Sequence, residues 1–356
     1  MRGSVQQRPD KGGCMERCVR CIMPASASGI SLDKDGVCQL CRDYTAYVPR
    51  GEAALRQDIA PFIDASAQYN CVVPVSGGRD SAYALYFAKK VLGLKPMAVH
   101  NDNDFETQVA TKNLEAITRS MDVPLVRVRS AKKISQKIVA EKFKMNARFG
   151  AGRCAAQACE ACQYGFETAS YNMARQHGIQ VIFWGDSRDE STKPYHQLVN
   201  KPEPGRLKRF LSPDALYIFT YNYYYNKLKK EYGPRTAEGL KEIHLYDYIR
   251  WDQKVIVDTI EEKMGWSVPD NSPTTWRVDC SLVPLINYLT EVAYGVSKIE
   301  LGFSNMVRSG KMDRDDALRR VAMIAKNTDI SQLRGFLSDM NISASMIDKM
   351  LSAGIR

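Results

Sequence analysis

The stretch Val73-Pro-Val-Ser-Gly-Gly-Arg-Asp-Ser81 decides the fold of this chain. It overlaps Tyr69-Asn-Cys-Val-Val-Pro-Val75, a run rich in β-branched residues that predicts a buried strand. Residues 82–92 follow, and their apolar side chains recur at helical spacing. The two glycines and two serines therefore lie on a turn from strand to helix. Because Gly77 and Gly78 can adopt positive φ, and the first N–H groups of a helix lack partners, this turn is expected to bind a phosphate group.

Strand and helix patterns alternate after this turn. Further strands are expected at residues 96–100, 124–128 and 180–184, and helices at 107–120, 134–145 and 160–177. Strands joined by helical crossovers form a parallel sheet covered on both faces, so we predict an α/β fold with a doubly wound parallel sheet. Ligands of such sheets bind at the carboxyl ends of the strands.

With 356 residues the chain exceeds the usual span of one domain. We expect a disordered tail at 1–13, a cysteine-rich zinc module at 14–48, a nucleotide-binding domain at 49–200, and a substrate-covering and helical C-terminal region at 201–356. No uninterrupted apolar run is long enough to span a bilayer, and the N-terminus has no apolar core for a signal peptide. We therefore expect a cytoplasmic protein with no membrane partner.

The formal net charge of +10 favours anionic partners such as a nucleotide, a phosphorylated sugar or RNA, although a solvated basic surface is the simpler alternative. The aromatic run Tyr221-Asn-Tyr-Tyr-Tyr225 is compatible with stacking on nucleobases or with ordinary packing. Neither feature selects one partner. A homodimer is compatible with the sequence.

Two Cys-x2-Cys pairs near the N-terminus offer four thiolates: Cys18, Cys21, Cys38 and Cys41. Four sulfurs are the ligand set of tetrahedral zinc, and clustered cysteines in a reducing compartment bind metal rather than form disulfides. We therefore predict a structural Zn²⁺ site in a zinc-ribbon-like module. Cys14 is an extra cysteine that could replace a ligand or be incidental.

A second cysteine set consists of Cys159, Cys162 and Cys280. Three thiolates are too few to close a structural zinc site, but they can hold three irons of a 4Fe-4S cluster and leave the fourth iron open to an external ligand. The alternative is a dithiol at Cys159 and Cys162 with an unrelated Cys280. Cys154 is a further candidate ligand.

The acidic string Gly185-Asp-Ser-Arg-Asp-Glu190 follows an expected strand, so its carboxylates should face the same crevice as the phosphate-binding turn. Mg²⁺ bridges one or two carboxylates to nucleotide phosphates, and Asp80, Asp186 and Asp189 are the candidates for this catalytic role. An ordinary acidic turn is the alternative. Asp102 and Asn103, after the second strand, could bind ribose or adenine.

The turn lacks the spacing of a Walker motif and of a dinucleotide fingerprint. Ser76-Gly-Gly-Arg-Asp-Ser81 instead resembles the S-G-G-x-D-S loop of the PP-loop ATP pyrophosphatases, which have an adenine nucleotide alpha hydrolase-like sheet. The resemblance implies that the loop binds the phosphates of ATP through Ser76, Gly77, Gly78, Asp80 and Ser81. Arg79 belongs to the same predicted ATP site and stands where many members carry lysine, which keeps the charge but changes its geometry.

Most of the chain resembles the N-acetyl sugar amidotransferase branch of this superfamily, which makes amidino sugars of bacterial surface polysaccharides. The likeness rests on the loop and on three further stretches: Cys18-Val-Arg-Cys-Ile-Met-Pro24, Gly36-Val-Cys-Gln-Leu-Cys41 and residues 302–317. It implies amidation with ammonia. No glutaminase signature is evident, so a partner glutaminase subunit would have to supply the ammonia.

The trio Cys159, Cys162 and Cys280 instead resembles the iron–sulfur PP-loop thiolation enzymes that modify tRNA, whose Gly-x-x-Arg-Asp-acidic pattern residues 185–190 repeat. Since spare thiolates have no role in amidation, we predict an ATP-dependent enzyme that adenylates a carbonyl or amide oxygen and replaces it with sulfur. Hydrosulfide on the open iron would be the nucleophile, a sulfur donor would supply it, and a small anionic acceptor such as a nucleotide sugar is favoured over tRNA. Amidation and a non-catalytic zinc- and nucleotide-binding partner protein are the alternatives.

Overall fold

The computed structural model describes residues 16–129, 133–149, 158–199, 215–269 and 272–352. The predicted tail at 1–13, Cys14 and Cys154 lie outside these residues.

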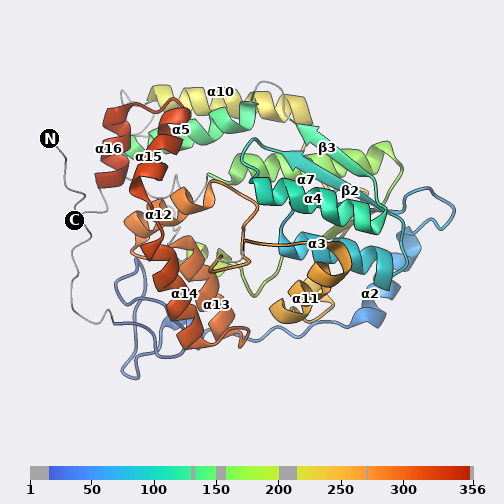
Figure 1. Cartoon of the computed structure of the whole chain (residues 1–356), viewed down its shortest axis with the longest axis horizontal. Helices are drawn as coiled ribbons and strands as arrows, with labels where there is room; N and C mark the ends of the chain where they lie inside the picture. The colour runs from blue at the N-terminus through green and yellow to red at the C-terminus, as the bar shows by residue number, and fades with distance from the viewer. Residues whose placement is uncertain (1–15, 130–132, 150–157, 200–214, 270–271, 353–356) are drawn as a thin grey trace.

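A five-stranded parallel sheet forms the centre of the fold (Figure 1). Its strands are β1 (Cys71–Pro74), β2 (Pro96–Asp102), β3 (Leu125–Arg129), β4 (Val181–Trp184) and β5 (Lys241–His244). Across the sheet they lie in the order β3-β2-β1-β4-β5. All four pairings are parallel, and β1 lies between β2 and β4. β5 is absent from the predicted strands because it is a short edge strand with one fully buried residue, Ile243, which leaves little apolar pattern.

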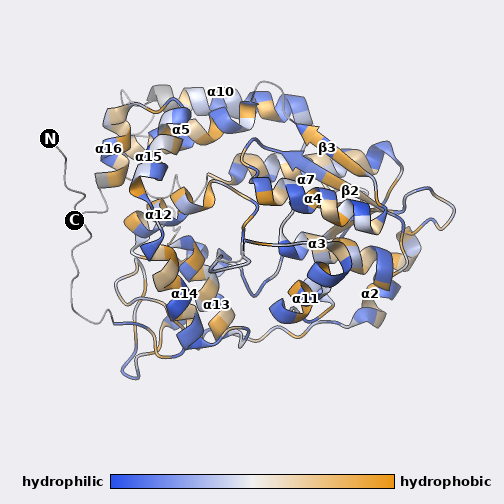
Figure 2. Ribbon diagram, in the orientation of Figure 1, coloured by the Kyte–Doolittle hydropathy of each residue, from blue (hydrophilic) through white to orange (hydrophobic). Residues whose placement is uncertain are grey.

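Helices cover both faces of the sheet, which confirms the predicted doubly wound α/β class. One face carries α2 (Glu52–Ile59), α3 (Arg79–Tyr86), α4 (Gln108–Met121) and α11 (Gln253–Met264). The other carries α5 (Ile134–Phe149), α7 (Glu160–Gln176) and α10 (Ala215–Tyr232). Val73 and its neighbour Val72 belong to different apolar clusters on opposite faces, as the two-residue period of a strand requires. In Figure 2, hydrophilic and hydrophobic residues alternate along these helices, as expected of amphipathic covering helices.

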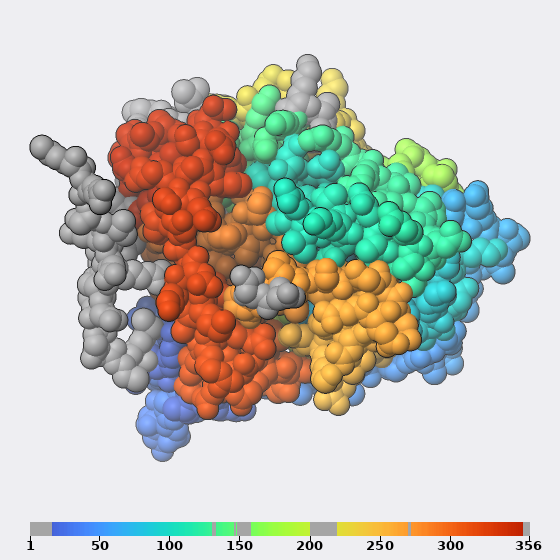
Figure 3. Space-filling view, in the orientation of Figure 1, coloured from blue at the N-terminus to red at the C-terminus, as the bar shows by residue number. Residues whose placement is uncertain are grey.

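Residues 283–352, within the predicted helical C-terminal region, form five helices. These are α12 (Val283–Tyr294), α13 (Lys298–Arg308), α14 (Arg314–Lys326), α15 (Ile330–Asp339) and α16 (Ala344–Ser352). Figure 3 shows this part of the chain in red and orange beside the teal and green atoms of its central part. α13 begins at a capping box, in which Ser297 accepts a hydrogen bond from the Glu300 N–H and the Glu300 carboxylate accepts one from the Ser297 N–H.

The remaining elements are short. They are α1 (Gln39–Arg42), η1 (Ala60–Phe62), η2 (Phe87–Val91), α8 (Lys193–Val199) and η4 (Leu245–Asp247). η2 is a π-helical turn that continues α3. Among the described helices, none has the length and apolar character needed to cross a membrane.

Candidate functional site

The predicted phosphate-binding turn joins β1 to α3, and Gly77 fixes its shape. Gly77 has φ of 81°, and a Cβ atom there would lie 2.5 Å from the carbonyl oxygen of Ala110 in the first turn of α4. The Gly77 carbonyl accepts hydrogen bonds from Trp266 Nε1 (2.8 Å) and Asn113 Nδ2 (3.3 Å). The position therefore requires glycine, both for its backbone angle and for its close approach to α4.

The two serines close the loop. The Gly78 N–H donates to Ser76 Oγ (3.2 Å), the Ser76 N–H donates to Ser81 Oγ (3.3 Å), and Ser81 Oγ donates to the Gly78 carbonyl (3.1 Å). Gly78 is the N-cap residue of α3, which no side chain caps. The first turn of α4 contacts the same loop at Gly77. The positive ends of two helix dipoles thus meet at this loop, which suits a polyanion such as a triphosphate.

The Arg79 side chain lies behind the loop and is 1% exposed. Its guanidinium pairs with Asp80 (2.9 Å) and Glu190 (2.6 Å) and donates to Thr275 Oγ1 (2.7 Å). Trp251 Nε1 also donates to the Asp80 carboxylate (2.9 Å). Burial raises the pKa of Glu190, against the influence of Arg79, and Asp80 raises it further. Arg79 is predicted as an ATP ligand, and in the structure its ion pair links the start of α3 to Glu190, the last residue of the acidic string.

The acidic string lies beside the loop, at the carboxyl end of β4. A Cβ atom on Gly185 would lie 2.6 Å from the Asp80 carbonyl oxygen, so this backbone packs directly on α3. Asp186 Oδ1 lies 2.7 Å from His244 Nδ1 at the end of β5, and its side chain is 64% exposed. The Asp189 N–H donates to Ser187 Oγ, and its carbonyl accepts from Asn305 of α13. The structure thus brings Gly185 and Glu190 to the loop, whereas Asp186 pairs with a histidine.

Asp102 and Asn103, the predicted ribose or adenine ligands, shape the loop after β2. Asp102 Oδ1 accepts from the Asp104 N–H (3.1 Å), and Asn103 Oδ1 accepts from the Phe105 N–H (3.0 Å). His100, also in β2, places Nδ1 2.8 Å from the Val75 carbonyl oxygen. His100 therefore ties this strand to the start of the phosphate loop.

Residues 275–281 cross the carboxyl edge of the sheet and contact the loop twice. Thr275 accepts from Arg79, and Asp279 Oδ2 would lie 3.3 Å from a Cβ atom on Gly78. Thr107, the N-cap of α4, holds this segment: its N–H donates to the Asp279 carbonyl (3.3 Å) and its hydroxyl to the Val278 carbonyl (2.8 Å). The contact joins parts of the chain about two hundred residues apart, so no local pattern indicates it. It places Asp279 beside the predicted phosphate site.

Cys280 lies near the end of this segment and forms an isolated antiparallel bridge with Glu106. Cys159 is the N-cap residue of α7, and Cys162 lies in the first turn of that helix. Cys159, Cys162 and Cys280 all pack against the same apolar cluster. Burial raises the pKa of Cys162, and the charges of Cys159 and Cys280 raise it further. The structure therefore gathers the predicted trio at the edge of the sheet that carries the phosphate loop.

Two cations accompany this trio. Lys298 Nζ, at the start of α13, lies 3.7 Å from Cys159 Sγ. Burial would raise the pKa of Cys159, but Lys298 and Arg277 outweigh it and lower this pKa below its usual value. Arg277 has φ of 51°, a strained angle for a residue other than glycine, and it lies two residues before Asp279. Both cations were missed in the sequence because they lie far from Cys159 along the chain.

The N-terminal cysteines form a compact set. Among the residues that the structure describes, Cys18, Cys21, Cys38 and Cys41 are the one group of three or more possible ligands whose donor atoms all lie within 4.8 Å of one another. The Cys18–Cys41 and Cys21–Cys38 sulfur pairs are both 3.8 Å apart. Sulfurs around a tetrahedral ion with bonds of about 2.3 Å lie about 3.8 Å apart, so this set fits one zinc-sized ion.

No protein-family model and no curated protein matches this sequence. Solved structures with a similar fold include an NMN synthetase from Francisella tularensis, with 14% identity, 73% of this chain and 85% of that chain covered, and a TM-score of 0.34. They also include the U34-tRNA thiolase NcsA from Methanococcus maripaludis with its 4Fe-4S cluster, with 11% identity, coverage of 84% and 88%, and a TM-score of 0.37. At these values, the function has to be argued from the residues of this chain.

Proposed function

We propose that this protein is an ATP-dependent transferase of the PP-loop superfamily that adenylates a carbonyl or amide oxygen of an anionic acceptor and replaces that oxygen with sulfur. One observation carries the proposal. Residues 275–281 contact the phosphate loop through Thr275 and Asp279, and the next residue, Cys280, packs against the same apolar cluster as Cys159 and Cys162. Activation and sulfur delivery would therefore occur within one crevice.

The loop would bind the β- and γ-phosphates of ATP. Its backbone amides and the two helix N-termini would neutralise the charge that develops on the departing pyrophosphate. The carboxylate of Asp279 lies beside Gly78 and is well placed to hold Mg²⁺ against these phosphates. Asp80 already accepts a hydrogen bond from Trp251, and Asp186 pairs with His244, so we place Asp279 ahead of both as a Mg²⁺ ligand.

The chemistry would take two displacements. The acceptor oxygen would attack the α-phosphorus of ATP, forming a P–O bond as the bond to pyrophosphate breaks. A sulfur nucleophile would then attack the activated carbon, forming a C–S bond as the C–O bond to AMP breaks. The first step turns a poor leaving group into a good one, which explains why the nucleotide site must adjoin the sulfur site.

Cys159, Cys162 and Cys280 would hold a 4Fe-4S cluster, which supplies an open iron that can take a soft sulfur ligand. Lys298 and Arg277 would offset the negative charge of the three thiolates. The positive net charge of the chain favours an anionic acceptor, and we favour a small one such as a nucleotide sugar over tRNA. The four N-terminal cysteines would bind Zn²⁺ as a structural ion.

Anaerobic purification tests the proposal directly. The wild-type protein should contain iron and acid-labile sulfide in addition to zinc, with a broad absorbance near ~400 nm, and the Cys159→Ala and Cys162→Ala variants should lose the iron and the absorbance. Cys71→Ala is the matched control, because Cys71 is buried in β1 outside this set and its loss should leave the iron in place. Colourless wild-type protein that binds only zinc would refute the sulfur-transfer proposal.

The second candidate is an N-acetyl sugar amidotransferase that uses ammonia from a partner glutaminase. The observation in its favour is that two stretches that carry the sequence resemblance lie in contact. Arg308 Nη2 lies 3.8 Å from Cys21 Sγ, and Arg314 donates to the Cys21 and Cys18 carbonyls. Ammonium-dependent formation of AMP with a nucleotide sugar, in iron-free protein, would support it. The absence of ATP turnover with every acceptor tested would favour a non-catalytic zinc- and nucleotide-binding protein instead.

A further inference from the structure

We propose that the N-terminal module, residues 16–42, positions the acidic string 185–190 through two side chains of α13, Arg308 and Asn305, and so sets the affinity of the protein for MgATP. The inference rests on the proposed function and deepens it, because it gives the four-cysteine set a part in nucleotide binding. Arg308 and Asn305 would act through the acidic string, so both are positioning residues.

A relay of hydrogen bonds joins the module to the string. Arg308 Nη2 lies 3.8 Å from Cys21 Sγ, and Arg308 Nη1 donates to Asn305 Oδ1 (2.8 Å). Asn305 Nδ2 in turn donates to the carbonyl oxygens of Arg188 (2.8 Å) and Asp189 (3.0 Å). A guanidinium can only donate and a carbonyl oxygen can only accept, so these partners fix the orientation of the Asn305 amide. The relay thus leads without a break from a predicted metal ligand to the backbone of the string.

The string in turn holds the first turn of α3. A Cβ atom on Gly185 would lie 2.6 Å from the Asp80 carbonyl oxygen, and Glu190 pairs with Arg79 (2.6 Å). Arg79 and Asp80 are the first two residues of α3, and the N-cap residue before them belongs to the phosphate loop. Because the amides of this turn must point at the phosphates to hold them, a shift of the string would weaken the binding of MgATP.

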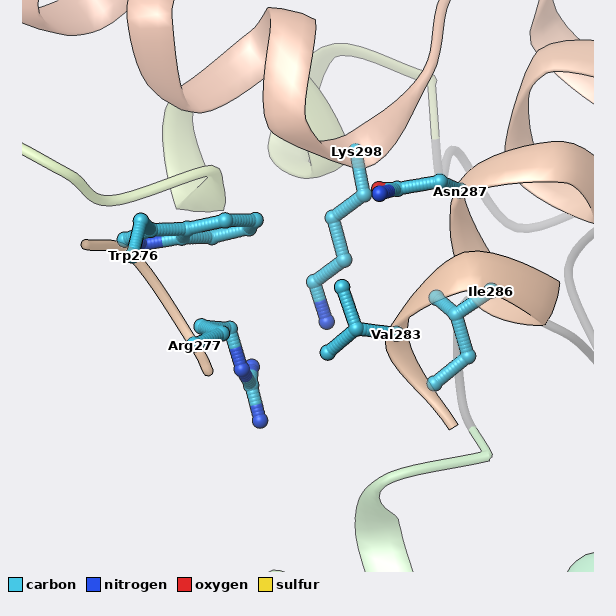
Figure 4. A pocket seen from close by; sticks show the side chains of 6 residues that line it. All are labelled: Trp276, Arg277, Val283, Ile286, Asn287 and Lys298. Atoms are coloured by element: carbon cyan, nitrogen blue, oxygen red, sulfur yellow. The ribbon is translucent and has the colours of Figure 1, made fainter. Parts of the chain in front are cut away.

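The helix α13 contacts the site at several points along its length. Figure 4 shows the side chain of Lys298, its first residue, next to Arg277 of the crossing segment. A Cβ atom on Gly302 would lie 3.7 Å from the Glu190 carbonyl oxygen. Asn305 follows three residues later, which places it on the same face of the helix. A packed helix moves as a unit, so a shift at its carboxyl end reaches the string.

A second tie between the two parts is exposed to solvent. Arg188 Cζ lies 4.5 Å from the centre of the ring of Tyr47, which follows the module, and Arg188 pairs with Asp247. The Arg188 side chain is 63% exposed, and exposed ion pairs contribute little because water and salt screen them. Asn305 is buried, so its hydrogen bonds are stronger. We therefore assign the coupling to the relay.

Metal binding gives the relay a fixed end. The module is too short to hold a core of its own, so its four sulfurs would keep their places through the ion that they bind. Arg308 contacts one of these sulfurs, and contacts of this kind hold a metal ligand and its partner in one orientation. Without the ion, Arg308 loses this fixed partner and the string loses its support. Zinc and MgATP are therefore expected to strengthen the binding of each other.

The test uses full-length protein purified anaerobically, with iron content determined on the same samples. Competition with a zinc-selective chromogenic chelator gives the zinc affinity with and without MgATP, and titration calorimetry gives the MgATP affinity of zinc-loaded and zinc-free protein. In the wild type, MgATP should raise the affinity for zinc about tenfold, and zinc should raise the affinity for MgATP by the same factor, because coupling between two sites is reciprocal.

Two variants interrupt the relay at different points. Asn305→Asp keeps an acceptor for Arg308 but loses the amide donor to the string. Arg308→Lys keeps the charge, but one ammonium group cannot bond Cys21 and Asn305 as a planar guanidinium does. In each variant, MgATP should change the zinc affinity by less than about twofold. Arg314→Gln is the matched control, because Arg314 donates to carbonyls of the module rather than to Asn305, and it should keep the full effect of MgATP.

Wild-type protein that binds MgATP equally well with and without zinc would overturn the relay. A full effect of MgATP in either folded relay variant would also overturn it. So would loss of the effect in Arg314→Gln, since any loosening of the module would then suffice. Wild-type protein that binds no MgATP would instead refute the proposed function, and the inference with it.

Discussion

Replacing Gly77 by alanine should damage the phosphate loop in two separable ways. The residue has φ of 81°, and an L-residue at such an angle costs about 1–2 kcal/mol. The new Cβ atom would also lie 2.5 Å from the Ala110 carbonyl oxygen and 2.9 Å from its Cα. Because both are backbone atoms of α4, relief requires a shift of the helix or of the loop, which costs a further 1–3 kcal/mol or so. We expect Gly77→Ala to lower the free energy of unfolding by about 2–5 kcal/mol.

Gly93→Ala provides the matched control. Gly93 has a similar φ of 72°, but a Cβ atom there would meet nothing within 4 Å. This variant should lose only the backbone term of about 1–2 kcal/mol and should bind MgATP like the wild type. The difference between the two variants isolates the close approach of the loop to α4.

Urea denaturation gives the two stabilities, and titration calorimetry with MgATP gives the binding. Gly77→Ala should bind MgATP at least tenfold more weakly, because a shifted loop no longer aims its amides at the phosphates. Equal stabilities for the two variants, or wild-type MgATP affinity in folded Gly77→Ala, would refute this account of the loop.

Three further predictions follow from other parts of the site. Without Mg²⁺, Asp279→Asn should bind ATP more tightly than the wild type, because a negative charge near the phosphates is gone. With Mg²⁺, it should bind ATP more weakly, because a metal ligand is lost. A higher ATP affinity of the variant in both conditions would show that Asp279 only repels ATP. Cys38→Ser should lose one metal equivalent, measured by mass spectrometry, and make the N-terminal module sensitive to protease, because that module is too short to hold a core of its own. Burial would raise the pKa of Glu106, but hydrogen bonds involving His100 and Thr111 lower this pKa below its usual value. The contribution of Glu106 to stability is therefore present above pH 4.5 and is lost as the pH falls through the lowered pKa. Glu106→Gln should therefore lower the free energy of unfolding by roughly 1–3 kcal/mol at pH 7 and by less at pH 4, and a gap between the two proteins that grows toward acid pH would contradict this assignment.

The sequence by itself determined the features that depend on neighbouring residues. The strand, the glycine turn and the helix around Ser76 can be predicted from the sequence, because apolar periodicity and glycine determine backbone conformation within a few residues. The pairing of Cys18 with Cys21 and of Cys38 with Cys41 is legible for the same reason, since two residues between cysteines suit one metal ion. The parallel direction of β1 to β4 followed from the alternation of strands and helices, whereas the strand order and β5 did not.

Only the tertiary structure decided which distant residues share the site. Arg79 lies in the loop motif, but its guanidinium forms an ion pair with Glu190. The Arg79 side chain is buried there because Gly185 packs directly on α3. Asp279 reaches Gly78, and Lys298 reaches Cys159, through contacts that close large loops of chain. Such contacts are fixed by how helices pack on the sheet and by the N-cap of α4 that holds the crossing segment. They leave no periodic trace in the sequence, because their geometry depends on the whole core rather than on adjacent residues.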